Sequence, residues 1–402
     1  MLLSLIAISV VLAGWSLLTR RLERWGLTAP MVLVLAGLAV GVMTRHDITG
    51  TLNTDAAQHA AEVILAVLLF VDATDVRGGM LGREPRPAVR MLFIALPLSL
   101  LGAVLAGMWL LPHLSWAVLL LIACVVVPTD FAPVTSILRD RRVPERVRNV
   151  LNVEAGYNDG ILSPTFIFAL ALAGDQSHAS TPLEALGAAV PEAIKAVLVG
   201  AAVGAALALL TNTAQRRDLL TEQSARMILV AAPLLSFGSS LAIGGNGFVA
   251  AFVCGLTYNG LRRSESIRRE LELVDDLGFL LSTVMWFVFG AAAVIALESG
   301  VSLGTIVFCL LALTVVRIVP VLVALLGTRF SLGERLLVGV LAPRGTTSIV
   351  FGLLAFNVLG GEDENEVLMT MVVAVLGSVV LHGLGTPAAV RAYSRAQTKL
   401  ST

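Results

Sequence analysis

In the stretch from residue 127 to residue 160, three acidic residues lie in or beside long apolar runs. Asp130 stands between Pro128 and Pro133, and Glu154 and Asp159 follow in the next run. A carboxylate at membrane depth costs about 3 kcal/mol or more by insertion scales, so such residues are normally kept for function. We therefore expect this stretch to hold an ion-binding carboxylate and the broken helix that helps to coordinate the ion.

Asp159 is the first candidate for the ion-binding group. It stands nearly three helical turns into a run that begins near residue 149, with Asn158 beside it. At that depth, loss of hydration favours the neutral acid, so the group can carry a proton. Hard cations prefer oxygen ligands, so the same carboxylate can hold a cation instead. One acid that binds either ion, but never both, is enough for coupled exchange. A structural charge paired with Arg317 or Arg344 is the competing interpretation.

Two polar breaks that contain proline interrupt the apolar runs, at residues 127–133 (VPTDFAP) and 342–348 (APRGTTS). Proline removes a backbone donor and clashes with the preceding turn, so each break should unwind its helix and free carbonyls for a cation. Asp130 can neutralise helix N-termini at the breaks, and Arg344 can neutralise C-termini. Two ordinary proline kinks are the alternative, which the ionisable group in each break disfavours.

Two further acids each have two possible assignments. Glu154 precedes Asp159 by five residues and is displaced from it around a helix by about 140°, so the two cannot point at one small site. We expect Glu154 to pair with Arg317 as a buried brace, although a solvated place at the cytoplasmic helix end stays open. Asp72, near the end of the third apolar run, could reach the ion site or lie at the membrane interface.

The elements that must position these residues are membrane-spanning helices. The chain has 402 residues, of which 57% are hydrophobic and only 14% charged, far less charge than a soluble protein carries. Apolar runs of about 20 residues recur throughout, as in polytopic membrane proteins. The predicted spans, thirteen in number, are 2–19, 29–43, 60–76, 90–111, 116–138, 149–173, 190–211, 226–243, 246–260, 276–297, 302–326, 335–358 and 366–388.

The basic residues support this number of spans. With thirteen spans, 24 of the 28 lysine and arginine residues fall in loops on one side, and Arg45 stands alone on the other. The positive-inside rule makes the rich side cytoplasmic. We therefore predict a multi-pass protein of the cell (inner) membrane, with the N-terminus outside and the C-terminus in the cytoplasm. The charged segment 262–276 is expected to be an amphipathic surface helix or a linker.

Thirteen spans divide into six, a linker span and six. The two breaks fall in the fifth span of each half, and corresponding interruptions point to inverted repeats with a binding site near the midplane. The predicted fold class is an all-α polytopic membrane protein of about 13 transmembrane helices, with two inverted six-helix repeats and crossed broken helices. The predicted units are residues 1–173 (first repeat), 174–225 (linker span) and 226–402 (second repeat and short cytoplasmic tail).

Several other kinds of protein are disfavoured by the sequence. It shows no P-loop, zinc-binding spacing or nucleophile elbow, so we expect neither an enzyme nor a bound cofactor, and no nucleic-acid partner. The three cysteines all lie in apolar runs, which disfavours disulfides and a metal cluster. His382, in the last span, is expected to be a packed residue and not a ligand.

At these residues the sequence resembles the monovalent cation:proton antiporter family, in its Na⁺/H⁺ exchanger branch. The likeness extends over nearly the whole chain, because the layout of thirteen spans fits as well. The matching residues are Pro128-Thr129-Asp130, Glu154 with Asn158-Asp159, Arg317, and Pro343-Arg344-Gly345.

The resemblance implies a role for each of them. Asp159 would be the essential ion- and proton-binding carboxylate, and Asn158 would mark the Asn-Asp branch, which resembles electroneutral exchangers. Thr129 would contribute a main-chain or hydroxyl oxygen, and Asp72 matches an acidic position near the ion in relatives. The candidate ion- and proton-binding residues are Asp159, Asn158, Asp130, Thr129 and Asp72. The candidate cation ligands are Asp159, Thr129 and Asp72, and the charge-compensating residues are Glu154, Arg317 and Arg344.

Two residues depart from the family pattern. Ala155 stands where many relatives have a serine that helps to hold the ion, and Phe131 stands where many have a proline. Both leave the choice of ion and its affinity open. By the same resemblance, the protein would be a homodimer in which a mobile core domain moves against a dimer scaffold.

The sequence therefore predicts a secondary-active antiporter that exchanges Na⁺, with K⁺ or Li⁺ as alternatives, for H⁺ by alternating access. Exchange would be electroneutral, with cation and proton competing for Asp159, and would serve pH homeostasis. The alternative is a cation-coupled transporter of small organic anions on a similar inverted-repeat fold, which the mostly acidic deep residues disfavour. A membrane scaffold or sensor without transport would leave the paired breaks unexplained.

Overall fold

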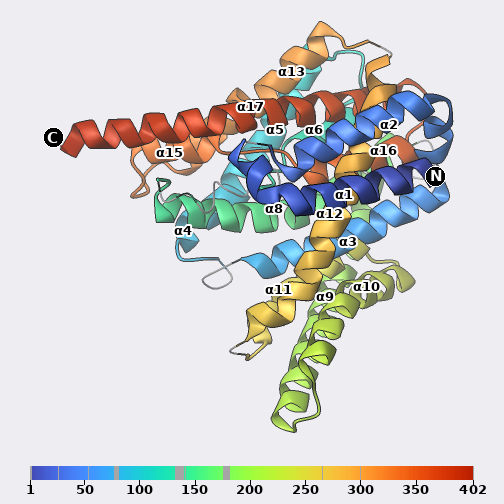
Figure 1. Cartoon of the computed structure of the whole chain (residues 1–402), viewed down its shortest axis with the longest axis vertical. Coiled ribbons are helices and arrows are strands. Elements are labelled where there is room, and N and C mark those ends of the chain that lie inside the picture. Colours follow the sequence, from blue (N-terminus) through green and yellow to red (C-terminus); the bar gives the residue numbers. More distant parts are fainter. Residues whose placement is uncertain are drawn as a thin grey trace.

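The structure is a computed structural model, and every regular element that it describes is a helix. The helices stack into a multi-layered bundle in which several run nearly parallel, while α9, α10 and α11 form a group on one side (Figure 1). The predicted all-α fold class is thereby confirmed. The described residues are 2–25, 27–52, 54–76, 81–131, 140, 142–174, 182–264, 266–298 and 300–401.

The helices of the first half are α1 (Leu2–Arg24), α2 (Ala29–Leu52), α3 (Asp55–Asp75), α4 (Pro85–Arg90), the π-helical η1 (Met91–Ala95), α5 (Leu96–Leu110), α6 (Trp116–Val126) and α8 (Glu145–Ala173). Those that follow are α9 (Pro182–Arg216), α10 (Glu222–Ala242), α11 (Gly247–Leu261), α12 (Ile267–Glu298), α13 (Leu303–Leu313), α14 (Val315–Ala324), α15 (Leu332–Val340), α16 (Thr346–Val358) and α17 (Glu362–Ser401). Each predicted span overlaps one helix or consecutive helices, although the described helical part of the span 116–138 ends at Val126.

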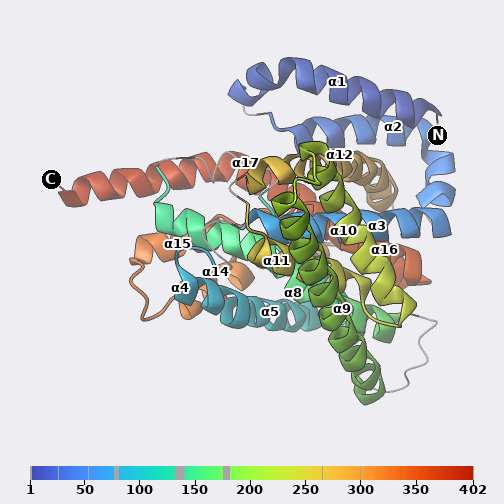
Figure 2. The same cartoon turned by 90° about the horizontal axis from the view of Figure 1, so that it is seen from below.

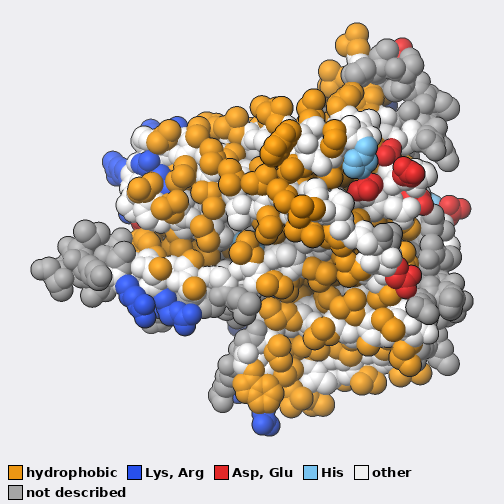
Figure 3. Space-filling model, turned by 90° about the horizontal axis from the view of Figure 1, so that it is seen from above, with side chains coloured by type: hydrophobic (Ala, Val, Ile, Leu, Met, Phe, Trp, Pro, Cys, Tyr) orange, Lys and Arg blue, Asp and Glu red, His pale blue; other side chains and the backbone are white. Residues whose placement is uncertain are grey.

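The apolar surface of the molecule is that of a protein in lipid. Eight helical stretches in the described part of the chain are long and apolar enough to cross a membrane, and four shorter apolar helices accompany them. Large side chains such as Leu17 and Leu303 are mostly exposed, which lipid tolerates and water does not. Hydrophobic side chains cover the middle of the face in Figure 3, while basic and acidic side chains gather at opposite ends.

One expectation about helix boundaries is wrong. The segment 262–276 is neither a separate surface helix nor a linker, because α12 begins at Ile267 and continues into the bundle. Arg262 is buried there and donates to both carboxylate oxygens of Glu270 at 2.8 and 2.9 Å, so these charges form an internal pair. At the other end of the chain, α17 continues beyond the last predicted span and runs to Ser401.

The two broken spans cross each other, as the fold class requires. The first leaves its helix after Val126, and the second is open between α15 and α16. The backbone N–H of Asp130 donates to the carbonyl oxygen of Pro343 at 2.9 Å, so the two unwound segments lie side by side. Pro133, the second proline of the first break, lies outside the described residues.

Helices α2 and α12 pack with their backbones in contact. A Cβ atom at Gly37 would overlap the carbonyl oxygen of Phe287, and one at Gly290 would overlap that of Val34. Close helix crossings in membranes select small residues for this reason. The crossing fixes α12, which borders the site described below.

Replacing Gly37 by alanine should therefore destabilise the fold. We expect Gly37→Ala to cost about 1–3 kcal/mol, the usual cost of overpacking, and to lower the midpoint of thermal unfolding in detergent micelles. Gly14→Ala in α1 is the matched control, because no atom lies within 4 Å of a Cβ atom there. Equal midpoints for the two variants would contradict the described crossing.

Candidate ion-binding site

Helix α8 carries Asp159 into the centre of the bundle, where its side chain is only 2% exposed. One carboxylate oxygen, Oδ2, accepts a hydrogen bond from the hydroxyl of Thr347 at 2.6 Å. The other oxygen, Oδ1, is buried and has no hydrogen-bond partner among the described residues. A buried polar atom without a partner costs free energy, so this oxygen is suited to bind a proton or a cation.

Asn158 holds the first break against α8. Its Nδ2 atom donates to the carbonyl oxygen and to the hydroxyl oxygen of Thr129, at 2.8 and 2.9 Å. The amide oxygen of Asn158 is buried and, within the described part of the chain, accepts no hydrogen bond. The site therefore contains a second oxygen that is available as a ligand, next to Asp159 in the sequence.

Asp130 lies at the N-terminus of α16. Its Oδ2 atom accepts from the backbone N–H of Thr346, the first residue of that helix, at 2.8 Å. A Cβ atom at position 345 would overlap the carboxylate, so Gly345 is required for this approach. The acid thus compensates an N–H group that the helix itself cannot satisfy.

Arg344 compensates the opposite helix ends. Its guanidinium group is buried and donates to the carbonyl oxygens of Val126, where α6 ends, and of Ala342, just after α15. A weaker contact of 3.4 Å reaches the carbonyl oxygen of Ala312. The structure thus places the positive charge at the carbonyl ends that the break frees.

Glu154 and Arg317 form a bidentate ion pair in which both side chains are 2% exposed. The pair ties α8 to α14. The predicted span 302–326 is interrupted at Thr314, whose backbone is not helical (φ −123°, ψ −88°), and Arg317 stands one turn beyond this interruption. No proline or glycine marks the interruption, so the sequence pattern did not indicate it.

Asp72 lies on α3, where this helix packs closely against α8. A Cβ atom at Gly156 would lie 2.9 Å from the carbonyl oxygen of Asp72, one helical turn from Asp159. Residue Asp72 is half-buried. The structure thus brings Asp72 to the edge of the site.

Thr347 is the contact that sequence reasoning missed. The second break carries two threonines and a serine, which indicated polar chemistry but not which hydroxyl faces the acid. The neighbouring Thr346 shares a 2.5 Å hydrogen bond with Ser282 of α12, and the Ser348 hydroxyl is buried without a partner in the described residues. The hydroxyls of α16 therefore surround the crossing point.

The charges of this site differ in how they are compensated. Asp130 faces a helix N-terminus, Arg344 faces carbonyl oxygens, and the brace between α8 and α14 is internally neutral. Asp159 has only a neutral hydroxyl as hydrogen-bond donor among the described residues. Among these buried carboxylates, Asp159 is therefore best placed to exchange a bound proton for a bound cation.

Comparisons with known proteins identify relatives of this chain. The chain resembles the K⁺/H⁺ antiporter NhaP2 of Shewanella oneidensis, with 28% identity over 294 residues, which are 71% of this chain and 48% of that protein. It also resembles a Na⁺/H⁺ antiporter of Schizosaccharomyces pombe, with 27% identity over 204 residues, which are 49% of this chain and 43% of that protein. The chain thus spans about half the length of the curated relatives that it matches.

A solved structure shows the same fold. The sodium proton antiporter MjNhaP1 from Methanocaldococcus jannaschii, determined at pH 8, superposes with a TM-score of 0.77 at 20% sequence identity, covering 98% of this chain and 99% of that one. A family model described as the transmembrane sodium/hydrogen exchanger matches residues 7–392. The resemblance predicted from the motifs is thereby confirmed. The chain is a multi-pass membrane protein that belongs to the sodium/hydrogen exchanger family.

Proposed function

We propose that this chain is a secondary-active antiporter that exchanges Na⁺, or alternatively K⁺ or Li⁺, for H⁺ through competition at Asp159. The proposal rests on the different surroundings of the two carboxylate oxygens of Asp159. Oδ2 accepts a hydrogen bond from Thr347, whereas Oδ1 has no hydrogen-bond partner among the described residues. A proton or a cation can occupy the second oxygen, but not both. Since a cation ligand must be deprotonated, cation binding releases the proton.

The cation would be held by oxygens from three elements. Asp159 and the amide oxygen of Asn158 come from α8, the main chain of Thr129 from the first break, and Asp72 from the edge of α3. Ala155, one helical turn before Asp159, brings no hydroxyl to that face of α8. The hydroxyl of Thr347, from the crossing helix, takes the place of the serine found in many relatives.

Electroneutral exchange follows from the same set of charges. Asn158 is uncharged and is engaged with Thr129, so it adds no second carboxylate to the deep site. If Asp159 alone changes its partner, one proton is replaced by one monovalent cation and the charge moved is zero. The relatives are named for Na⁺ and for K⁺, and both ions suit an oxygen site.

Alternating access would use the body that these contacts tie together. The crossing at Asp130 and Pro343 and the brace between Glu154 and Arg317 couple α8, α14 and both breaks. Movement of this body past the other helices would present Asp159 to either side of the membrane. A homodimer scaffold, two inverted repeats, a cytoplasmic C-terminus in the cell membrane and a role in pH homeostasis belong to the same proposal.

Neutralising Asp159 should abolish transport. In proteoliposomes with an internal pH dye, we expect Asp159→Asn to show no proton flux above background when a cation gradient is applied. Asp75→Asn is the matched control, because it removes an acid that lies at the end of α3, away from the deep site, where it is an exposed partner of Arg268. Asp159→Asn should also keep its thermal stability, since it removes a buried charge. Full exchange by this variant would refute the proposal.

The same assay on the unmodified protein tests the competition. On the acid side of the pH profile, the cation concentration for half-maximal exchange should rise roughly tenfold for each unit by which the pH is lowered. The reason is that proton and cation exclude each other. The rate should not depend on an imposed membrane potential. A pH-independent half-maximal concentration, or a rate that follows the potential, would contradict competition or electroneutrality respectively.

Removing the Thr347 hydroxyl should weaken cation binding without abolishing exchange. A hydrogen bond to a charged group contributes about 1.5–3 kcal/mol, so Thr347→Val should raise the half-maximal cation concentration by ~10- to 100-fold. The loss disfavours the carboxylate relative to the neutral acid, so the transport profile should also move to higher pH. Thr347→Ser keeps the hydroxyl and serves as the control. If the valine variant behaves like the serine variant, the hydrogen bond plays no part in transport.

Breaking the buried brace should affect stability more than ion affinity. Glu154→Gln leaves Arg317 without its ionised partner, which typically costs about 3–5 kcal/mol and should lower the thermal unfolding midpoint. The double variant Glu154→Gln with Arg317→Met should recover part of that loss. At a temperature where the single variant stays folded, its half-maximal cation concentration should equal that of the unmodified protein. A change like that of Thr347→Val would instead make Glu154 part of the ion site.

A further inference from the structure

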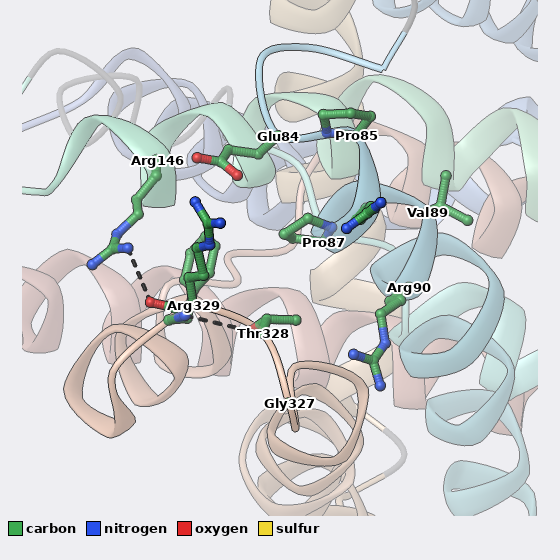
Figure 4. Close-up of a pocket in the computed structure, with 11 residues that line it drawn as sticks. Glu84, Pro85, Pro87, Val89, Arg90, Arg146, Gly327, Thr328 and Arg329 are labelled. Carbon is green, nitrogen blue, oxygen red and sulfur yellow. Dashed lines mark hydrogen bonds between the residues drawn. The ribbon is translucent and has the colours of Figure 1, made fainter.

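A hollow of about 920 Å³ opens at the basic end of the molecule, away from the ion-binding site. It lies between α4, the first turn of α8 and the connection from α14 to α15 (Figure 4). Four arginines from these three elements line it, together with one acid, Glu84. The arginines are Arg86, Arg90, Arg146 and Arg329.

The positive charge of this hollow is only partly compensated. Arg146 donates to both oxygens of Glu334 at 2.6 and 2.7 Å, and Arg90 donates to the carbonyl oxygen of Leu326 at 2.7 Å. Arg86 and Arg329 are exposed, and neither forms an ion pair with any residue that the structure describes. Four guanidinium groups thus meet two carboxylates, and like charges gathered around one hollow repel each other unless an anion lies between them.

The shape and chemistry of the hollow identify the class of anion. Guanidinium groups bind phosphate oxygens through paired hydrogen bonds, and the buried Pro87 and Phe330 give the lining an apolar part. The volume is far larger than a simple ion needs and falls in the range of small-molecule sites, roughly 300–1,000 Å³. Pro85 begins a helical stretch, Pro85–Leu110, that is long and apolar enough to cross a membrane. A hollow at the end of such a stretch would be within reach of phospholipid headgroups.

We propose that this hollow binds a phosphate-bearing anion, supplied either by an anionic phospholipid headgroup or by a soluble phosphate compound. The ligand would bridge Arg86 on α4 and Arg329 on the connection before α15, across Arg146 on α8. The pair formed by Arg146 and Glu334 already joins α8 to α15 at this place. Since α8 carries the ion-binding acid and α15 leads into the second break, the bound anion would hold the ends of the transporting body together.

The experiment measures binding and does not depend on transport. The purified full chain, in neutral detergent without alkali cations, is unfolded thermally with increasing Tris pyrophosphate against Tris chloride of equal ionic strength. A second arm compares mixed micelles that contain phosphatidylglycerol with micelles that contain phosphatidylcholine. We expect a saturable rise of the unfolding midpoint in at least one arm, as for any ligand that binds the folded state alone.

Two double variants test the location. Arg86→Gln with Arg329→Gln should raise the half-saturating concentration at least ~tenfold, because it removes the two exposed arginines of the hollow. Arg391→Gln with Arg395→Gln is the matched control, since it removes two exposed charges from the part of α17 that lies at the same end of the molecule (Figure 2). The control should bind like the unmodified chain.

Each outcome decides the matter. If pyrophosphate raises the unfolding midpoint, the site accepts soluble phosphate compounds. If only phosphatidylglycerol raises the midpoint, the site is specific for lipid headgroups. No rise in either arm would overturn the proposal. Equal weakening in both double variants would also overturn it, because the effect would then come from general surface charge.

Discussion

A charge that leaves water must be compensated, and this requirement explains most of the buried core. Glu154 and Arg317 neutralise each other, while Asp130 meets a helix N-terminus. Arg344 meets carbonyl oxygens at helix C-termini. Because these charges are satisfied locally, Asp159 is left with a single neutral donor among the described residues and can take a partner from outside the chain. The site depends on this contrast more than on any one ligand.

The crossing of the two breaks provides the geometry for that contrast. Unwound backbone at membrane depth is tolerated only where protein surrounds it, and here each break supplies partners for the other. Asp130 forms hydrogen bonds with Pro343 and Thr346 of the second broken span. Arg344 donates a hydrogen bond to the carbonyl oxygen of Val126 in the first broken span. Each break therefore supplies hydrogen-bond partners for backbone groups that unwinding leaves free in the other.

Local patterns in the sequence were sufficient for part of this arrangement. Proline beside a charged residue located both breaks, and helical angles separated Glu154 from Asp159. The contact of Thr347 with Asp159 joins residues 188 positions apart, and periodicity cannot specify which hydroxyl faces which acid. The interruption at Thr314 has no proline or glycine at its position, so no local signal in the sequence marked it. The basic hollow is assembled from distant segments, so it was invisible in any single stretch of the sequence.

Gly345 shows how tightly this arrangement restricts variation. Its α-carbon lies so close to Asp130 that even a methyl group there would collide with the carboxylate. Mutational histories of these two positions should therefore be linked, since a bulkier residue at one is tolerable only if the other shortens or withdraws. A homologue that lost Asp130 would need another anionic group at the N-terminus of α16. Only a few combinations of residues should therefore be found at these two positions.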